Sequence, residues 1–92
     1  MRVVWSLRSL GDLDRIWLFL AQRDIDLAHR TIATIRLRAQ RLVAYPQLGR
    51  PVGRAYREWS IIEVRYVVTY AISDGQVRIV RVHHARENRE TP

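Results

Sequence analysis

The dipeptide Asp74-Gly75 constrains the fold of this chain more than any other feature of its sequence. It separates two apolar runs, 65–72 and 77–84. Asp-Gly is the favoured two-residue turn of a β-hairpin, because both central positions need a positive φ. The sequence therefore predicts an antiparallel hairpin in the last third of the chain.

A two-residue turn also fixes which residues face each other across the hairpin. One face is predicted to pair Ile72 with Val77, Tyr70 with Ile79, Val68 with Arg81, and Tyr66 with His83. The other face is predicted to pair Ala71 with Arg78, Thr69 with Val80, Val67 with Val82, and Arg65 with His84. Both faces carry apolar side chains, and two helices can cover only one of them. We expect a partner segment on the second face, the alternative being the loop at 46–55 or the C-terminal tail.

The first half of the chain is predicted to contain a short strand at Arg2–Trp5 and then two helices. Ser9 and Asp12 have the spacing of a capping box for the first helix, whose apolar stripe is Leu13, Ile16, Trp17 and Leu20.

Asp24 is the predicted cap of the second helix, which should end before Pro46. Its apolar stripe is Ala28, Ile32, Ile35, Ala39 and Leu42. The short link between the two helices indicates an antiparallel helical hairpin.

The rest of the chain is predicted to be a proline- and glycine-rich loop at 46–55, strands at 56–64, 65–72 and 77–84, and a mobile polar tail at 85–92. The fold class is therefore α+β, in one domain covering 1–92. An N-terminal strand precedes the helical hairpin, and a three-stranded antiparallel meander follows it. The helices should pack on one face of the sheet.

The charge is strongly one-sided. The 92 residues include 16 basic side chains against nine acidic ones, and every basic side chain is arginine. Codon bias explains the missing lysine but not the excess of base, which favours an acidic partner or nucleic acid. There is no cysteine, and the N-terminal apolar run is too short for a signal peptide or a membrane span, so we expect a cytoplasmic protein without membrane contact.

One end of the predicted hairpin gathers arginine, histidine and tyrosine, namely Arg65, Tyr66, Arg81, His83 and His84, with Arg86 just beyond. Such a cluster can bind phosphate or perform acid–base chemistry, although a solvated basic rim is the simpler interpretation. Adjacent histidines on a strand point to opposite faces, and no carboxylate lies beside them in the sequence. We therefore expect no metal and no cofactor.

The order of these elements resembles the ParE-like, plasmid-stabilisation type of toxin in the RelE/ParE superfamily. The resemblance covers nearly the whole chain through the order and spacing of six segments: 17–21, 28–42, 45–51, Arg57-Glu58-Trp59, Tyr66-Val67-Val68-Thr69-Tyr70, and 80–86. It departs from the family at Trp59, where leucine is usual. The resemblance implies a toxin of a type II toxin–antitoxin system, neutralised by a cognate antitoxin, with a toxin–antitoxin hetero-oligomer as one form.

Two activities occur in this superfamily. RelE-like members cut messenger RNA on the ribosome, whereas ParE-like members inhibit DNA gyrase and block replication. RelE-like members usually carry an arginine where this chain has Val67, and they often end with a tyrosine, whereas no tyrosine follows Tyr70. The resemblance therefore favours gyrase inhibition without catalysis, while His83, His84 and Arg86 favour the alternative, a ribosome-dependent endoribonuclease.

These interpretations assign three sets of residues. The antitoxin-binding candidates are Trp17, Leu20, Ile35, Val68, Tyr70 and Ile79. The target-binding candidates are Arg57, Arg65, Arg81, His84 and Arg86. For a nuclease, the catalytic candidates are Arg65, Arg81, His83, His84 and Arg86.

Overall fold

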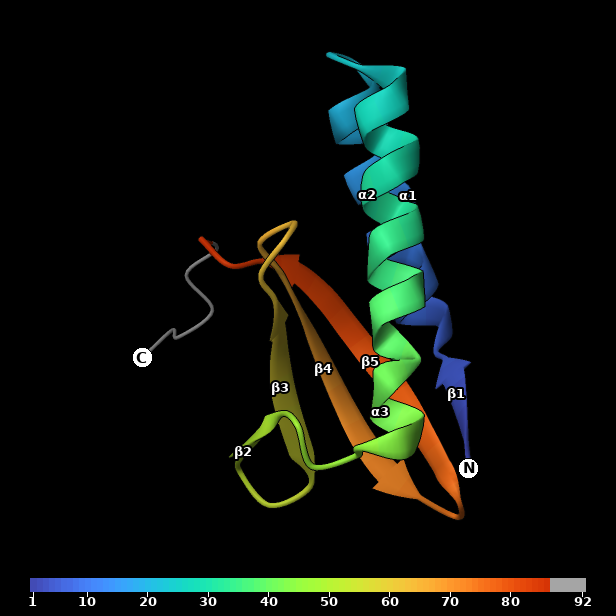
Figure 1. The fold of residues 1–92 in the computed structure, drawn as a ribbon, viewed down its shortest axis with the longest axis vertical. Coiled ribbons are helices and arrows are strands. Elements are labelled where there is room, and N and C mark those ends of the chain that lie inside the picture. The colour runs from blue at the N-terminus through green and yellow to red at the C-terminus, as the bar shows by residue number, and fades with distance from the viewer. Residues whose placement is uncertain (87–92) are drawn as a thin grey trace.

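The computed structural model describes residues 1–86; the predicted mobile tail lies mostly outside this range. A short strand leads into a helical hairpin, and four strands complete the sheet (Figure 1). The elements are β1 (Arg2–Trp5), α1 (Leu7–Ala21), α2 (Ile25–Ala39), α3 (Arg41–Ala44), β2 (Arg50–Val52), β3 (Tyr56–Ile61), β4 (Tyr66–Ser73) and β5 (Gln76–His84).

Within residues 1–86 the strands form one five-stranded sheet in the order β1-β5-β4-β3-β2. The predicted antiparallel meander is present as β3, β4 and β5, but it is only part of a mixed sheet, because β1 pairs with β5 in parallel. The predicted loop at 46–55 also contains a strand, β2, at the edge of the sheet. Pro51 is compatible with this place, since an edge strand has one side without ladder hydrogen bonds.

The Asp74-Gly75 turn is confirmed: both residues have positive φ, at 52° and 70°. The predicted register is also correct next to the turn, where Ile72 faces Val77 and Tyr70 faces Ile79.

Beyond Tyr70 and Ile79 a β-bulge shifts the pairing by one residue. Val68 faces Val82 instead of Arg81, and Tyr66 faces His84 instead of His83. The bulge therefore moves Val82 to the core face of β5, and Val82 is only 3% exposed. On the other face of the hairpin, Val67 was predicted to face Val82 but instead faces His83. This face is therefore less apolar than the sequence predicted.

The caps of the two helices differ from the prediction in one case. Asp24 caps α2 as expected, its carboxylate accepting the Leu27 N–H at 3.0 Å. In α1 the cap is Ser6, whose hydroxyl accepts the Ser9 N–H at 3.0 Å. The predicted capping box at Ser9 and Asp12 is therefore wrong. The helix starts earlier because Ser6 directly follows β1, and this leaves Asp12 free to face β5.

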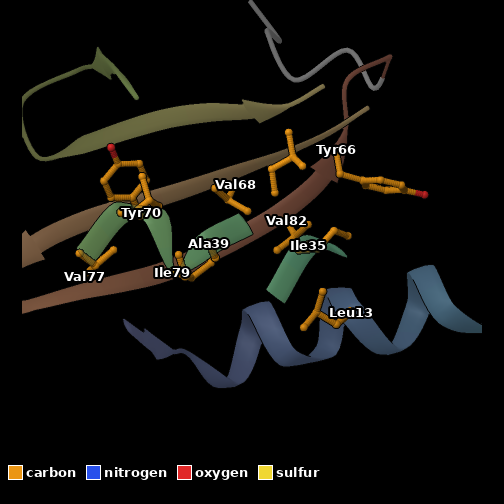
Figure 2. Packing of buried hydrophobic residues seen from close by; sticks show 11 residues of the cluster. Leu13, Ile35, Ala39, Tyr66, Val68, Tyr70, Val77, Ile79 and Val82 are labelled. Atoms are coloured by element: carbon orange, nitrogen blue, oxygen red, sulfur yellow. The ribbon is translucent and has the colours of Figure 1, made fainter. Parts of the chain in front are cut away.

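The core lies between the helices and one face of the sheet, as predicted (Figure 2). The apolar stripe of α2 is confirmed by Ala28, Ile35 and Ala39, which are all 0% exposed. From the sheet, Val68, Tyr70, Val77, Ile79 and Val82 pack into the same cluster. Leu13 of α1 belongs to the same cluster, so this packing also holds α1 beside β5.

Candidate functional site: a basic pocket beside the last strand

The local connection between β1 and α1 decides what lies beside the second half of β5. The pairing of β1 with β5 ends at Trp5 and Ile79. The Ser6 N–H donates to the Ile79 carbonyl at 3.0 Å, and the chain then turns into α1, which packs along β5. On the edge of β5 that faces away from β4, side chains of α1 rather than another strand therefore border the end of β5.

A pocket with a volume of about 620 Å³ lies at this junction. We call it the α1–β5 pocket. Its lining is Arg15, Ile16 and Phe19 from α1, Tyr66 from β4, and Arg81, Val82, His83 and His84 from β5. The mixture of cationic and apolar side chains suits a ligand that carries both a negative charge and an apolar group.

Asp12 lies behind the lining and organises its arginines. The carboxylate is 2% exposed and accepts four hydrogen bonds. Arg81 donates from Nε at 2.9 Å and from Nη2 at 3.3 Å, the Val82 N–H donates at 2.8 Å, and Arg15 donates from Nη2. A buried carboxylate requires such partners, because burying a charge without them is costly. Asp12 thus holds the Arg81 side chain in one direction, and it attaches the backbone of β5 to α1 through the Val82 N–H.

The aromatic part of the pocket is also ordered. The rings of Tyr66 and His84 meet edge to face with centroids 5.0 Å apart. The Nδ1 atom of His84 accepts the Arg86 N–H at 3.0 Å, and the Ala85 N–H donates to the Arg65 carbonyl at 2.8 Å. These contacts hold the end of β5 against the turn that joins β3 to β4.

The structure brings together only part of the predicted basic cluster. Four of its members line the pocket: Tyr66, Arg81, His83 and His84. Arg65 and Arg86 are exposed and lie outside its lining. Arg65 occupies the turn between β3 and β4, with a φ of 62° that the sequence did not signal, since arginine is not a usual residue at positive φ.

The remaining target-binding candidate, Arg57, is a structural anchor elsewhere in the fold. Its Nη1 donates to the Gly49 carbonyl at 2.6 Å. The same loop is held by Tyr70, whose hydroxyl donates to the Pro46 carbonyl at 2.6 Å and accepts the Gly49 N–H at 2.9 Å. Burial is the main cause that raises the pKa of Tyr70 above its ordinary value.

Four of the six antitoxin-binding candidates are unavailable to a partner in this structure. Ile35, Val68, Tyr70 and Ile79 are each 0% exposed, so their choice as surface contacts is corrected. An apolar stripe shows that a face is buried, but not what buries it. The other two candidates, Trp17 and Leu20, are partly buried on α1, and Trp17 contacts the ring of His29 edge to face at 5.6 Å.

Sequence reasoning missed the α1 side of the pocket. Asp12, Arg15 and Phe19 follow a spacing of three and four residues, which places them on one side of the helix next to the apolar stripe. This spacing was the available signal. The signal is weak because Asp12 also fits the spacing of a helix cap, and because Phe19, which is 60% exposed, lies off the stripe.

Among residues 1–86, histidine and acidic side chains form no group of three that is able to hold a metal ion. No helix in the same part of the chain is both long and apolar enough to cross a membrane.

A helical hairpin packed on a mixed five-stranded sheet makes this chain a small basic α+β protein, and the family match places it in the RelE/ParE superfamily. The family model described as "ParE toxin of type II toxin-antitoxin system, parDE" matches residues 3–89. The chain therefore belongs to the ParE toxin family.

Two individual relatives are also named as toxins, of the RelE type. The chain is 36% identical to Toxin RelE2 of Caulobacter vibrioides over 84 residues, covering 91% of this chain and 94% of the relative. It is 32% identical to Toxin RelE1 of the same bacterium over 89 residues, covering 95% and 96%. A solved structure titled "Chromosomal ParDE TA system from P. aeruginosa" has the same fold, with a TM-score of 0.81 at 19% identity over 94% of this chain and 97% of that chain.

Proposed function

We propose that this toxin acts by binding rather than by catalysis, that it inhibits DNA gyrase in the cytoplasm and so blocks replication, and that a cognate antitoxin neutralises it. The observation that supports binding most strongly is the engagement of Arg81. Both Nε and Nη2 of this side chain donate to Asp12. A catalytic arginine would instead direct these donors at the phosphate, which gains further negative charge in the transition state.

The sequence at β4 supports the same interpretation. The RelE-like pattern has an arginine at the position of Val67, and here this position holds a buried apolar side chain that is 8% exposed. A side chain without a charge or a hydrogen-bonding group cannot stabilise an anion.

The second candidate function is a ribosome-dependent mRNA endoribonuclease. It is favoured by the histidines and Tyr66 around one pocket, and by relatives that are named RelE2 and RelE1. In this mechanism a base such as His83 or His84 would take the proton of the ribose 2′-hydroxyl, while an arginine stabilises the phosphate.

Expression of the toxin in growing cells separates the two functions. A gyrase poison leaves broken DNA, so a DNA-damage reporter should respond while reporter transcripts stay intact. Mapping transcript ends by primer extension measures the alternative. New transcript ends that appear before any DNA-damage response would reject gyrase inhibition in favour of the nuclease.

The proposed antitoxin partner is an acidic or amphipathic chain encoded next to the toxin. The net charge of +7 supports this partner, because electrostatic steering speeds association with an acidic chain. Co-expression with the product of the upstream neighbour should give a stable hetero-oligomer that restores growth. The absence of a complex at both low and high salt would reject this partner.

A further inference from the structure

A second pocket, with a volume of about 200 Å³, lies at the opposite end of β4 from the α1–β5 pocket. We call it the β2–β3 pocket. Its lining is Pro51, Gly53, Arg54, Ala55, Tyr56 and Arg57 from β2, β3 and the turn between them, and Tyr70, Ala71 and Ile72 from β4. The two pockets share no lining residue, so each is able to take a ligand of its own.

The β2–β3 pocket carries positive charge that no carboxylate compensates. Its lining includes Arg54 and Arg57 and no acidic side chain. Within residues 1–86 neither arginine forms a salt bridge, unlike the arginines of the α1–β5 pocket, which share a buried carboxylate. Glu58, next to Arg57 in the sequence, pairs with Arg50 instead, at 3.2 Å. The pocket therefore attracts an anion from outside the chain.

Arg57 is held in place without losing its charge. Its Nη1 donates to the neutral Gly49 carbonyl at 2.6 Å, whereas Nε and Nη2 form no hydrogen bond within residues 1–86. Gly49 is itself fixed by Tyr70, whose hydroxyl accepts the Gly49 N–H at 2.9 Å. An ordered side chain loses less entropy when it binds a ligand. The two remaining nitrogens suit a ligand with two anionic oxygens.

The size of the pocket limits what enters it. Pockets for small molecules usually have volumes of about 300–1,000 Å³, and this pocket is smaller. Protein segments gain most of their affinity from bulky side chains that become buried in a pocket. The β2–β3 pocket instead suits a compact anionic group, and the rest of the ligand must then lie on the surrounding surface.

This surrounding surface offers an aromatic ring and a further arginine. Tyr56 lines the pocket and is 46% exposed. Arg78, exposed on β5, faces Ala71 of the pocket lining. A single-stranded nucleic acid has the matching chemistry, because its phosphates follow one another along the backbone and its bases stack on aromatic side chains. An acidic protein segment would also pair with the arginines, but it would find no large pocket for an apolar side chain.

We propose that the β2–β3 pocket binds a phosphodiester group of single-stranded DNA through Arg54 and Arg57, and that an adjacent base stacks on Tyr56. The proposal rests on the proposed function in one respect, because gyrase holds the DNA that the toxin would meet in the cell. A contact with this DNA adds to the contact with the enzyme, so the toxin would bind gyrase that holds DNA more tightly than gyrase alone.

Fluorescence polarisation with the full-length protein tests the site. The first probe is a labelled oligothymidylate of about 12 nucleotides. The second is a labelled oligoglutamate of the same net charge, which offers carboxylates and no bases. The wild type should bind the oligothymidylate about tenfold more tightly, because only this probe stacks on Tyr56. Equal or tighter binding of the oligoglutamate would overturn the proposal in favour of an acidic protein ligand.

Arg54→Gln tests the cationic part of the pocket. Arg23→Gln is the matched control, because Arg23 is exposed in the link between α1 and α2, at the end of the helical hairpin that lies away from β2 (Figure 1). Relative to this control, Arg54→Gln should weaken oligothymidylate binding by about tenfold and lower the salt dependence, log affinity against log salt, by about 0.7. Equal affinities of the two variants would overturn the pocket, because net charge alone would then explain the binding.

Arg57→Lys tests whether a planar guanidinium holds the phosphate, since lysine keeps the charge but offers no parallel pair of N–H groups. Thermal melting must first show that the variant is folded. Oligothymidylate binding should then be about fivefold weaker than in the wild type. Wild-type affinity in the folded variant would overturn the role of Arg57.

Tyr56→Ala tests stacking, with Tyr45→Ala as the matched control, because Tyr45 is also exposed but lies outside the pocket lining. Tyr56→Ala should weaken oligothymidylate binding by about tenfold relative to this control, and it should change oligoglutamate binding by less than about twofold. Equal oligothymidylate affinities of the two variants would overturn the stacking contact.

Supercoiling reactions measure the proposed function separately from this site. A wild-type protein that stops supercoiling but does not bind the oligothymidylate would overturn the site and leave gyrase inhibition intact. A protein that binds the oligothymidylate in the predicted way but leaves supercoiling unchanged would support the site and reject gyrase inhibition.

Discussion

Asp12 of α1 and Arg81 of β5 are joined by two hydrogen bonds of 2.9 and 3.3 Å across 69 positions of the chain. The same carboxylate accepts the Val82 N–H, which lies next to the β-bulge. A backbone N–H that is buried without an acceptor is destabilising. Because β1 no longer pairs with β5 at this point, the Val82 N–H finds its acceptor in the side chain of Asp12. One carboxylate therefore shapes the pocket and also attaches the helix to the strand.

Asp12→Ala should lower the free energy of unfolding by about 2–4 kcal/mol, because it leaves the Val82 N–H and the inner donors of Arg81 without their acceptor. Urea denaturation measures the change. Asp14→Ala, at an exposed position of the same helix, should change stability by less than about 0.5 kcal/mol. Equal stability of the two variants would contradict the structural role of Asp12.

Tyr70→Phe should destabilise the fold by about 1–3 kcal/mol, because the Gly49 N–H loses its acceptor and the Pro46 carbonyl loses its donor. The effect also depends on pH. The folded-state pKa of Tyr70 is raised above its ordinary value of 10.0, so the stabilisation by the protonated hydroxyl is present below that pH and is lost as pH rises through the folded-state pKa. Above pH 10 the wild type should therefore lose stability more steeply than Tyr70→Phe, as measured by urea denaturation across alkaline pH. Parallel curves would contradict this assignment.

Two glycine substitutions should act in opposite directions. A Cβ atom at Gly49 would lie 2.8 Å from the Glu58 carbonyl oxygen and from Tyr70, so Gly49→Ala should destabilise the fold by about 1–3 kcal/mol. At Gly11, inside α1, the nearest atom is the Arg15 guanidinium at 3.7 Å. Gly11→Ala should therefore stabilise by about 0.5–1 kcal/mol through helix propensity. Thermal melting of both variants measures the two effects, and a shift in the same direction would contradict them.

Replacing His83 and His84 together by alanine should leave growth inhibition largely intact, because the proposed activity needs no general base. His83 is only 8% exposed, so circular dichroism and thermal melting must first show that the variant is folded. A folded variant that no longer arrests growth, and that also fails to produce transcript ends which the wild type produces, would support the endoribonuclease instead.

The sequence predicted those parts of the fold that local chemistry determines. The turn at Asp74-Gly75 set the register of its neighbouring pairs, and Asp24 capped α2. The apolar stripe of α2 gave its buried face, because helical spacing is a property of the segment alone. The meander and the helical hairpin followed from these signals and from the family resemblance.

Long-range contacts decided what the sequence did not predict. The β-bulge beside Thr69 and Tyr70 has no signal in residues 65–84 and places Val82 in the core. The strand β2 forms only because β3 lies beside it. The α1–β5 pocket required Asp12 to meet β5, a contact between residues far apart in the sequence, so only the β-strand half of the candidate site could be named in advance: Tyr66, Arg81, His83 and His84.

The central claim is that this toxin inhibits gyrase by binding and does not cut RNA. The most direct measurement adds purified protein, over the same concentration series, to gyrase supercoiling reactions and to a reconstituted translation reaction. We expect supercoiling to stop and cleaved DNA to accumulate at concentrations that leave translation and its messenger RNA intact. Loss of translation with cleaved messenger RNA, at concentrations that leave supercoiling unchanged, would contradict the account.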